Sequence, residues 1–197
     1  MSIKKRILAV ALIVIVLSTL FYGCNNNYKE IEKKVRIILV GNLLLPNVDT
    51  TLKENLEKII NDKVNIDQIL YTGKNARTQQ EIAYQQKLLV IMAAGEGDLF
   101  ILDKELFKAY ASKGAFLPLD QLLEKYKYLN KYANNEFYIK AEDAKKKALY
   151  GLSAQSIKVL SDAGFDTKNK VIAIYVRTNK KERAIQALKS LLDSSVK

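Results

Sequence analysis

The chain has 197 residues, of which 49% are hydrophobic and 27% charged, and its formal net charge is +11. This is an ordinary globular composition, which suits one domain, or one domain plus a leader. The chain has no histidine, no tryptophan and one cysteine, which excludes Ser-His-Asp and Cys-His catalysis, histidine zinc sites and an intrachain disulfide. We therefore expect a binding protein and not an enzyme, with no cofactor and no metal.

The N-terminal stretch has the pattern of a secretory leader. Three basic residues at positions 4–6 precede a charge-free run over residues 7–22, and Gly23, Cys24 and three asparagines follow. A basic start, an apolar run and a small residue before the cut are typical of such leaders. The alternative is that the apolar run is retained as a membrane-spanning anchor. Its length lies at the short end of the range for membrane-spanning helices, about 17–25 residues.

A cysteine directly after that small residue resembles the lipobox of bacterial lipoproteins, in which the cysteine is diacylated and the leader is cut before it. The resemblance implies a lipid on Cys24, a leader over 1–23, a polar tether over 24–34 and one domain over 35–197. Phe21 and Tyr22 depart from the pattern, which usually has leucine and a small residue there. Either anchor places the domain on the extracellular face of the cell membrane, where we expect no nucleic-acid partner despite the basic charge.

The remaining chain alternates between two patterns. Apolar β-branched runs predict strands, and amphipathic stretches that end at glycine or begin at a polar cap predict helices. In chain order we expect a strand at 34–41, helix 50–63, strand 64–73, helix 77–94, strand 98–102, helix 104–114, a helix from 120, strand 148–153, helix 156–164, strand 170–178 and helix 179–194. This alternation predicts an α/β fold, a three-layer sandwich with a mainly parallel sheet.

A Gly-x-Gly turn at residues 95–97 separates a predicted helix from a predicted strand. A phosphate-binding loop has the reverse order, strand and then helix, so we interpret this turn as structural. Gly95 is expected to end the helix in the left-handed region, and Gly97 to allow a tight turn into the strand. Ligands of open α/β sheets bind at the carboxyl ends of the strands, which places a site near Asp103 and Lys104.

The segment GEGDLFILDKELFKAYASKGAFLPL, residues 95–119, resembles part of the extracellular solute-binding proteins of ABC importers. ALYGLS at 148–153 resembles the Tyr-Gly strand near the hinge of that family, and residues 171–192 resemble the strand and helix that return to its first lobe. The resemblance implies a single periplasmic-binding-protein-like lobe in a membrane-anchored lipoprotein that binds a small solute for an ABC permease.

Candidate ligand-binding residues follow the expected strands at their carboxyl ends. They offer hydrogen bonds or a positive charge to a solute. They are Asn42, Thr72, Lys74, Asn75, Asp103, Lys104 and Gln155. Each also has a structural interpretation: Asp103 as a helix cap, Thr72 as part of a turn, and the lysines as solvated surface charges.

The length of the chain departs from the family that it resembles. Members are about twice as long and close two lobes over the ligand, whereas only residues 153–170 separate the hinge-like strand from the return strand. That is too few for a second lobe, and one lobe offers half a cleft. A second function therefore stays open: a one-lobe surface module that binds a protein or a cell-wall polymer without transport.

Overall fold

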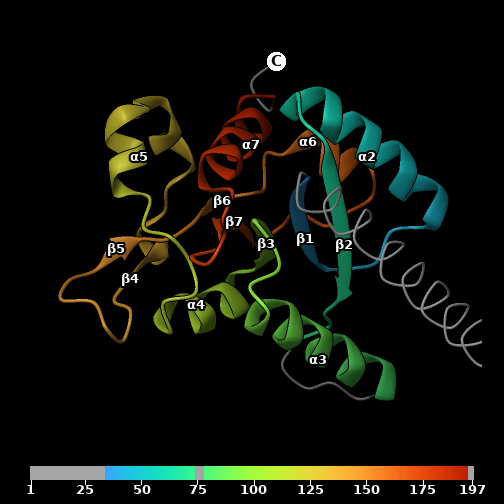
Figure 1. The fold of residues 1–197 in the computed structure, drawn as a ribbon, viewed down its shortest axis with the longest axis horizontal. Helices are drawn as coiled ribbons and strands as arrows, with labels where there is room; N and C mark the ends of the chain where they lie inside the picture. The colour runs from blue at the N-terminus through green and yellow to red at the C-terminus, as the bar shows by residue number, and fades with distance from the viewer. Residues whose placement is uncertain (1–33, 74–77, 195–197) are drawn as a thin grey trace, which may run out of the picture. The chain divides into compact units, whose positions relative to one another are not determined.

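The computed structural model describes residues 34–73 and 78–194, which contain a five-stranded sheet flanked by helices (Figure 1). Cys24, the predicted leader and the candidates Lys74 and Asn75 lie outside the described residues. The elements are β1 (Val35–Gly41), α2 (Pro46–Ile60), β2 (Val64–Leu70), α3 (Gln79–Ala93), β3 (Leu99–Asp103), α4 (Lys104–Ser112), α5 (Asp120–Lys125), the 3₁₀ turns η1 (Lys127–Tyr132) and η2 (Asn135–Phe137), β4 (Tyr138–Ile139), β5 (Ala148–Leu149), β6 (Leu152–Ser153), α6 (Lys158–Asp162), β7 (Lys170–Ile174) and α7 (Lys181–Asp193).

The sheet has the strand order β2-β1-β3-β7-β6. Strands β2, β1 and β3 are parallel, and β7 is antiparallel to both of its neighbours. The prediction of an α/β fold with a mainly parallel sheet is confirmed. The exception has a physical reason: α6 has five residues and rises only about 7.5 Å, so the chain starts β7 at the same edge of the sheet at which β6 ends.

Helices pack along the strands and bury the side chains at the centre of the sheet. Helix α2 contacts β2, α6 and α7, and α7 also contacts β1 and β7, whereas α3 contacts β2 and α4 contacts β3 and β7. Figure 1 shows α3 and α4 across the strands from α2 and α7. All five residues of β7 and the first four of β3 are buried, as expected for strands covered on both faces.

Two predicted elements differ from the structure. Helix α2 begins at Pro46 and not near residue 50, because proline suits the first helical turn, where its missing N–H is not needed. The single strand expected at 148–153 is two short strands, β5 paired with β4 and β6 paired with β7. The chain bends between them at Gly151, where a Cβ atom would clash with Val171 and Phe107.

The turn at residues 95–97 is structural, as predicted, and it lies at the amino end of β3. Gly95 and Gly97 have φ angles of +73° and +125°. A Cβ atom on Gly97 would lie 2.8 Å from the ring of Phe100 and 3.1 Å from Ile38. Phe100, the predicted core residue, is fully buried, with its ring centroid 5.4 Å from that of Tyr175. Gly97 thus allows the chain to pass directly over the core.

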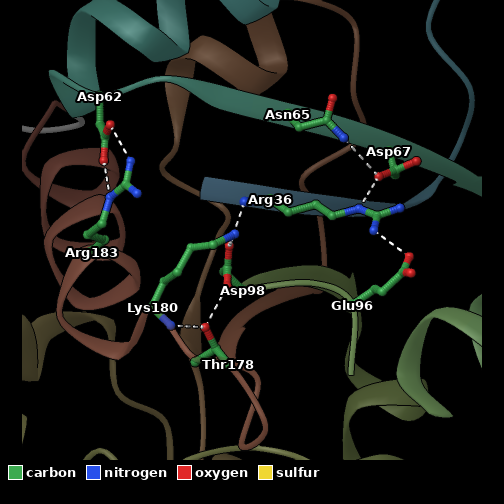
Figure 2. A network of polar contacts seen from close by, with 9 residues as sticks. All are labelled: Arg36, Asp62, Asn65, Asp67, Glu96, Asp98, Thr178, Lys180 and Arg183. Carbon is green, nitrogen blue, oxygen red and sulfur yellow. Dashed lines mark hydrogen bonds and ion pairs between the residues drawn. The ribbon is translucent and has the colours of Figure 1, made fainter. Parts of the chain in front are cut away.

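The amino end of β3 carries a buried carboxylate, Asp98, which is 3% exposed. It accepts hydrogen bonds from the backbone N–H of Arg36 (2.7 Å), the Thr178 hydroxyl (2.5 Å) and the Lys180 ammonium group (3.2 Å) (Figure 2). A buried carboxylate is tolerated only when it is paired and hydrogen-bonded. Asp98 therefore ties the start of β1 to the turn that leads into α7.

The side chain of Arg36 extends this network to β2 and to the turn after α3. Its Nε donates to Asp67 at 2.6 Å and its Nη1 to Glu96 at 2.5 Å (Figure 2). Burial lowers the pKa of the Arg36 guanidinium, but the hydrogen bonds to the two carboxylates outweigh this effect and raise the pKa overall. A second pair, Arg183 with Asp62, joins α7 to the loop after α2.

We expect Gly97→Ala to lower the free energy of unfolding by about 2–4 kcal/mol, because it combines a positive φ with overpacking against Phe100. Gly114→Ala is the matched control: its φ is +74° and no atom lies within 4 Å of the added Cβ, so only the backbone penalty of about 1–2 kcal/mol applies. Urea denaturation measures both. Equal losses would mean that Phe100 moves aside at no cost.

Candidate ligand-binding site

An open cleft of about 600 Å³ lies at the carboxyl ends of β1, β2 and β3, opposite the Asp98 network. Its volume falls within the range of known ligand pockets, about 300–1,000 Å³. The lining residues come from the ends of these strands, the start of α4 and the loop before β7. They are Asn42, Leu70, Tyr71, Thr72, Gly73, Asp103, Lys104, Glu105, Asp166, Asn169 and Lys170.

An ion pair between Asp103 and Lys170 forms part of the cleft wall. The two residues face each other in the antiparallel register of β3 and β7, and the Lys170 Nζ lies 2.7 Å from the Asp103 Oδ2. The Lys170 side chain is 5% exposed and that of Asp103 31%. A Cβ atom on Gly41 would lie 2.8 Å from the same Nζ, so the glycine at the end of β1 leaves the space that Lys170 fills.

The pairing corrects the interpretation of Asp103 as a helix cap. The residue does occupy the N-cap position of α4, but its side chain makes no capping hydrogen bond. Its carboxylate binds Lys170 instead, because a buried ammonium group needs a charged partner more than an exposed helix end needs a cap.

The predicted positive charge of Lys104 is engaged by a carboxylate from a distant part of the chain. Its Nζ lies 3.0 Å from Glu136, which also pairs with Lys108 at 2.5 Å. Hydrogen bonds from Lys108 and Lys104 hold the pKa of the Glu136 carboxyl below its usual value. Lys104 therefore lines the cleft as half of an ion pair.

Asn42 and Thr72 line the cleft but also hold its walls together. The Asn42 amide donates to the carbonyl of Gly164 at 2.8 Å, and its oxygen accepts from the N–H of Asp166 at 2.8 Å. The Thr72 hydroxyl donates to Glu81 in the first turn of α3. Asn42 thereby fixes the loop before β7, and Thr72 fixes the end of β2 to α3.

Gln155 is not among the cleft-lining residues. It is exposed and follows β6, the outermost strand, which β7 separates from β3. Its carbonyl accepts a hydrogen bond from Thr167. The prediction placed Gln155 in the cleft because β6 ends at the same edge of the sheet, but it did not account for the intervening strand.

Sequence reasoning missed several lining residues, above all Tyr71 and Lys170. Tyr71 is half-buried, and its burial, followed by the negative charges of Asp103 and Glu105, raises the pKa of its hydroxyl. A tyrosine immediately before the predicted Thr72 loop was a usable signal. Lys170 had none, because its place opposite Asp103 depends on the antiparallel pairing of β7 with β3.

Two further properties concern only the part of the chain that the structure describes. None of its helices combines the length and apolar content needed to cross a bilayer. It also contains no group of three or more cysteine or acidic side chains arranged to hold a metal ion.

No protein-family model matches the chain, and no curated protein matches it. Its similarity to solved structures is partial. The N-glycan transport solute-binding protein NgtS from Streptococcus pneumoniae, in complex with Man5GlcNAc, is 23% identical with a TM-score of 0.39, and the alignment covers 60% of this chain and 24% of that chain. A second structure of NgtS is 21% identical with a TM-score of 0.40, and the alignment covers 68% of this chain and 30% of that chain. CpMnBP1 with mannobiose bound is 22% identical (TM-score 0.38, 69% and 35%). The chain thus aligns with about a quarter to a third of each of these proteins.

We expect Asp103→Asn to destabilise the fold by about 2 kcal/mol, because it leaves the Lys170 ammonium group buried without its charge partner. Asp103→Asn combined with Lys170→Met should recover most of that loss, since no buried charge remains. Glu136→Gln is the control: it removes an exposed partner of two lysines and should change stability little. Urea denaturation of the three variants and the unaltered chain tests this. A double variant no more stable than the single one would contradict the explanation.

Proposed function

We propose that the domain binds a small polar solute in the cleft at the carboxyl ends of β1, β2 and β3. The observation that carries the proposal is the placement of this cleft, about 600 Å³ in volume, where open α/β sheets bind their ligands. We further propose that the fold is one lobe of a solute-binding protein, a sheet between two helical layers, that serves an ABC permease.

The lining favours an uncharged, hydroxyl-bearing solute such as a sugar. Asp103 and Lys170 neutralise each other, and Lys104 is paired with Glu136. The carboxylate of Asp166 adds negative charge to the lining, which repels anionic solutes and offers acceptors to hydroxyl groups. The half-buried ring of Tyr71 supplies an aromatic surface beside them.

We also propose that a lipid on Cys24 tethers the domain to the extracellular face of the membrane. The support is the sequence pattern: a basic start, a charge-free run over residues 7–22, and then Gly23-Cys24. A tethered receptor stays close to the permease that it supplies.

The second candidate function is a surface module that binds an anionic protein or wall polymer without transport. A separate groove of about 430 Å³ between α5 and α7 favours it. Leu122 and Ile185 contribute apolar surface to this groove, and its charged lining has three lysines and one carboxylate: Lys125, Lys181, Lys189 and Glu182. The Lys189 Nζ lies 3.8 Å from the centre of the Tyr126 ring. Chemical-shift changes on this groove, and not at the cleft, would favour this function.

A thermal-shift screen of the full chain against sugars, amino acids, peptides and dicarboxylates tests the cleft. A bound sugar at 100 times its dissociation constant should add about 2.7 kcal/mol of stability. Tyr71→Ala should abolish that gain, whereas Tyr128→Ala, a change of an exposed tyrosine beside α7, should preserve it. A gain that survives Tyr71→Ala, or hits confined to dicarboxylates, would refute the proposed site.

Mass spectrometry of the protein extracted from membranes tests the anchor. We expect a chain that starts at a diacylated Cys24, and we expect Cys24→Ala to block normal processing. A chain that retains Met1 and carries no lipid would support the membrane-spanning alternative instead.

A further inference from the structure

The outer face of helix α3 is almost free of charge. Ile82, Leu89 and Val90 point outward, and Leu89 and Val90 are 55% and 65% exposed. The exposed positions of this fully described helix are Gln79, Gln80, Ile82, Ala83, Gln86, Lys87, Leu89, Val90 and Ala93. Of these, only Lys87 carries a charge. The inner face is also apolar, with Leu88, Ile91 and Met92 buried. The last six residues of α3, positions 88–93, are therefore apolar on both faces, and a helix segment of this kind is normally covered on both.

The other long helices show what a water-facing helix looks like in this domain. The exposed positions of α2 include Glu54 and Lys58, and those of α7 include Lys181 and Glu182. Figure 1 shows α3 with the sheet on one side and no other described helix or strand on its far side. The difference in composition therefore indicates a missing partner for α3 in particular.

The position of α3 relative to the start of β1 indicates which partner that is. The turn after α3 is bonded to the start of β1 through Glu96 and Arg36, so the last turns of α3 lie near the point at which residues 1–33 join the domain. The eleven residues from Cys24 to Lys34 span at most about 40 Å. An anchor at Cys24 keeps this part of the domain within that distance of a bilayer, and an anchor in the apolar run that ends at residue 22 adds two residues of chain.

The charged side chains at the margin of the face suit an anionic lipid surface. Lys87 lies on the same helix, with its side chain 46% exposed and its ammonium group 3.8 Å from Asp67, and the Arg177 guanidinium donates to the carbonyl of Ala93 at 3.1 Å. The nearby carboxylate of Glu96 is paired with Arg36. Basic residues beside an apolar helix face are typical of helices that lie in the membrane interface.

We propose that the outer face of α3 docks on the lipid bilayer that anchors the chain, with Leu89 and Val90 inserted at the level of the headgroups. The inference rests on the membrane anchor proposed above but not on solute binding. No cleft-lining residue belongs to α3, so docking leaves the cleft walls uncovered. The bilayer thus restricts the domain to one orientation, which a tether alone would not do.

Photo-crosslinking tests the docking in the full chain, reconstituted in vesicles of phosphatidylglycerol and phosphatidylethanolamine. A diazirine analogue of leucine is placed at position 90 or, as the matched control, at position 45, where Leu45 is 68% exposed after the far end of β1. Position 90 should give roughly ten times more phospholipid adduct, since interfacial helices bury their apolar face about 5–10 Å deep.

A double change supplies a second measurement. Leu89→Gln with Val90→Gln removes the apolar surface and keeps good helix-forming residues. A diazirine probe at position 93 should lose most of its phospholipid adduct in this variant relative to the same probe in the unaltered chain. Circular dichroism of both chains confirms that α3 is retained.

The outcomes separate docking, anchoring and solute binding. Vesicle flotation of the same samples reports the anchor, and a chain that does not float overturns both anchoring and docking. A chain that floats but gives equal phospholipid adducts at positions 90 and 45, or none at either, overturns docking alone. So does a crosslink from position 90 to a second copy of the chain or to residues 7–22. The thermal-shift response to sugars decides solute binding independently of all these results.

Discussion

The buried carboxylate of Asp98 is the constraint on which the rest of this fold depends. Its three donors come from residues 62, 80 and 82 positions away in the chain. Burial of an unpaired carboxylate is prohibitively costly, so the native state forms only when β1, β3 and the turn after β7 are all in place. The hydrogen bonds to Asp98 hold β7 beside the central strand β3.

A similar lysine–aspartate interaction holds the other end of the β3–β7 pair. Strand β7 begins at Lys170, which is paired with Asp103 at the end of β3, and the turn after β7 supplies Thr178 and Lys180 to Asp98 before the start of β3. Each end of the β3–β7 pair is thus held by a lysine–aspartate interaction. The end at Asp98 is closed, whereas the end at Asp103 opens into the cleft, where 31% of the aspartate side chain remains exposed.

The cleft proposed for a solute and the α3 face proposed for docking would together suit a domain that works at a membrane surface. If the domain is the single lobe proposed, it would enclose little of a ligand, which would limit the affinity that burial can provide. Confinement at a membrane beside a permease or a polymer raises the effective concentration of the partner. A weak site is useful there, and a fixed orientation from α3 would direct the cleft toward that partner consistently.

The sequence by itself determined the local elements of this protein. The apolar runs predicted the long strands, the turn at residues 95–97 was correctly interpreted as structural, and Phe100 was correctly placed in the core. Carboxyl ends of parallel strands share one edge of a sheet, so Asn42, Thr72, Asp103 and Lys104 could be predicted to gather there, and they do line one cleft. The elements follow from local residue patterns, and the gathering of the cleft residues follows from the parallel order of the strands.

Only the tertiary structure decided which side chains pair across the sheet. The antiparallel direction of β7 brings Lys170 to Asp103, and the order β3-β7-β6 removes Gln155 from the cleft. The fold brings Glu136 to Lys104, with which it forms an ion pair. The hydrogen-bond partners of Asn42 lie more than 120 residues further along the chain. Charged and polar side chains form ion pairs and hydrogen bonds with groups that lie close in space, and burial in the folded core determines how strong each interaction is. The amino-acid sequence gives neither the distances between these side chains nor their burial.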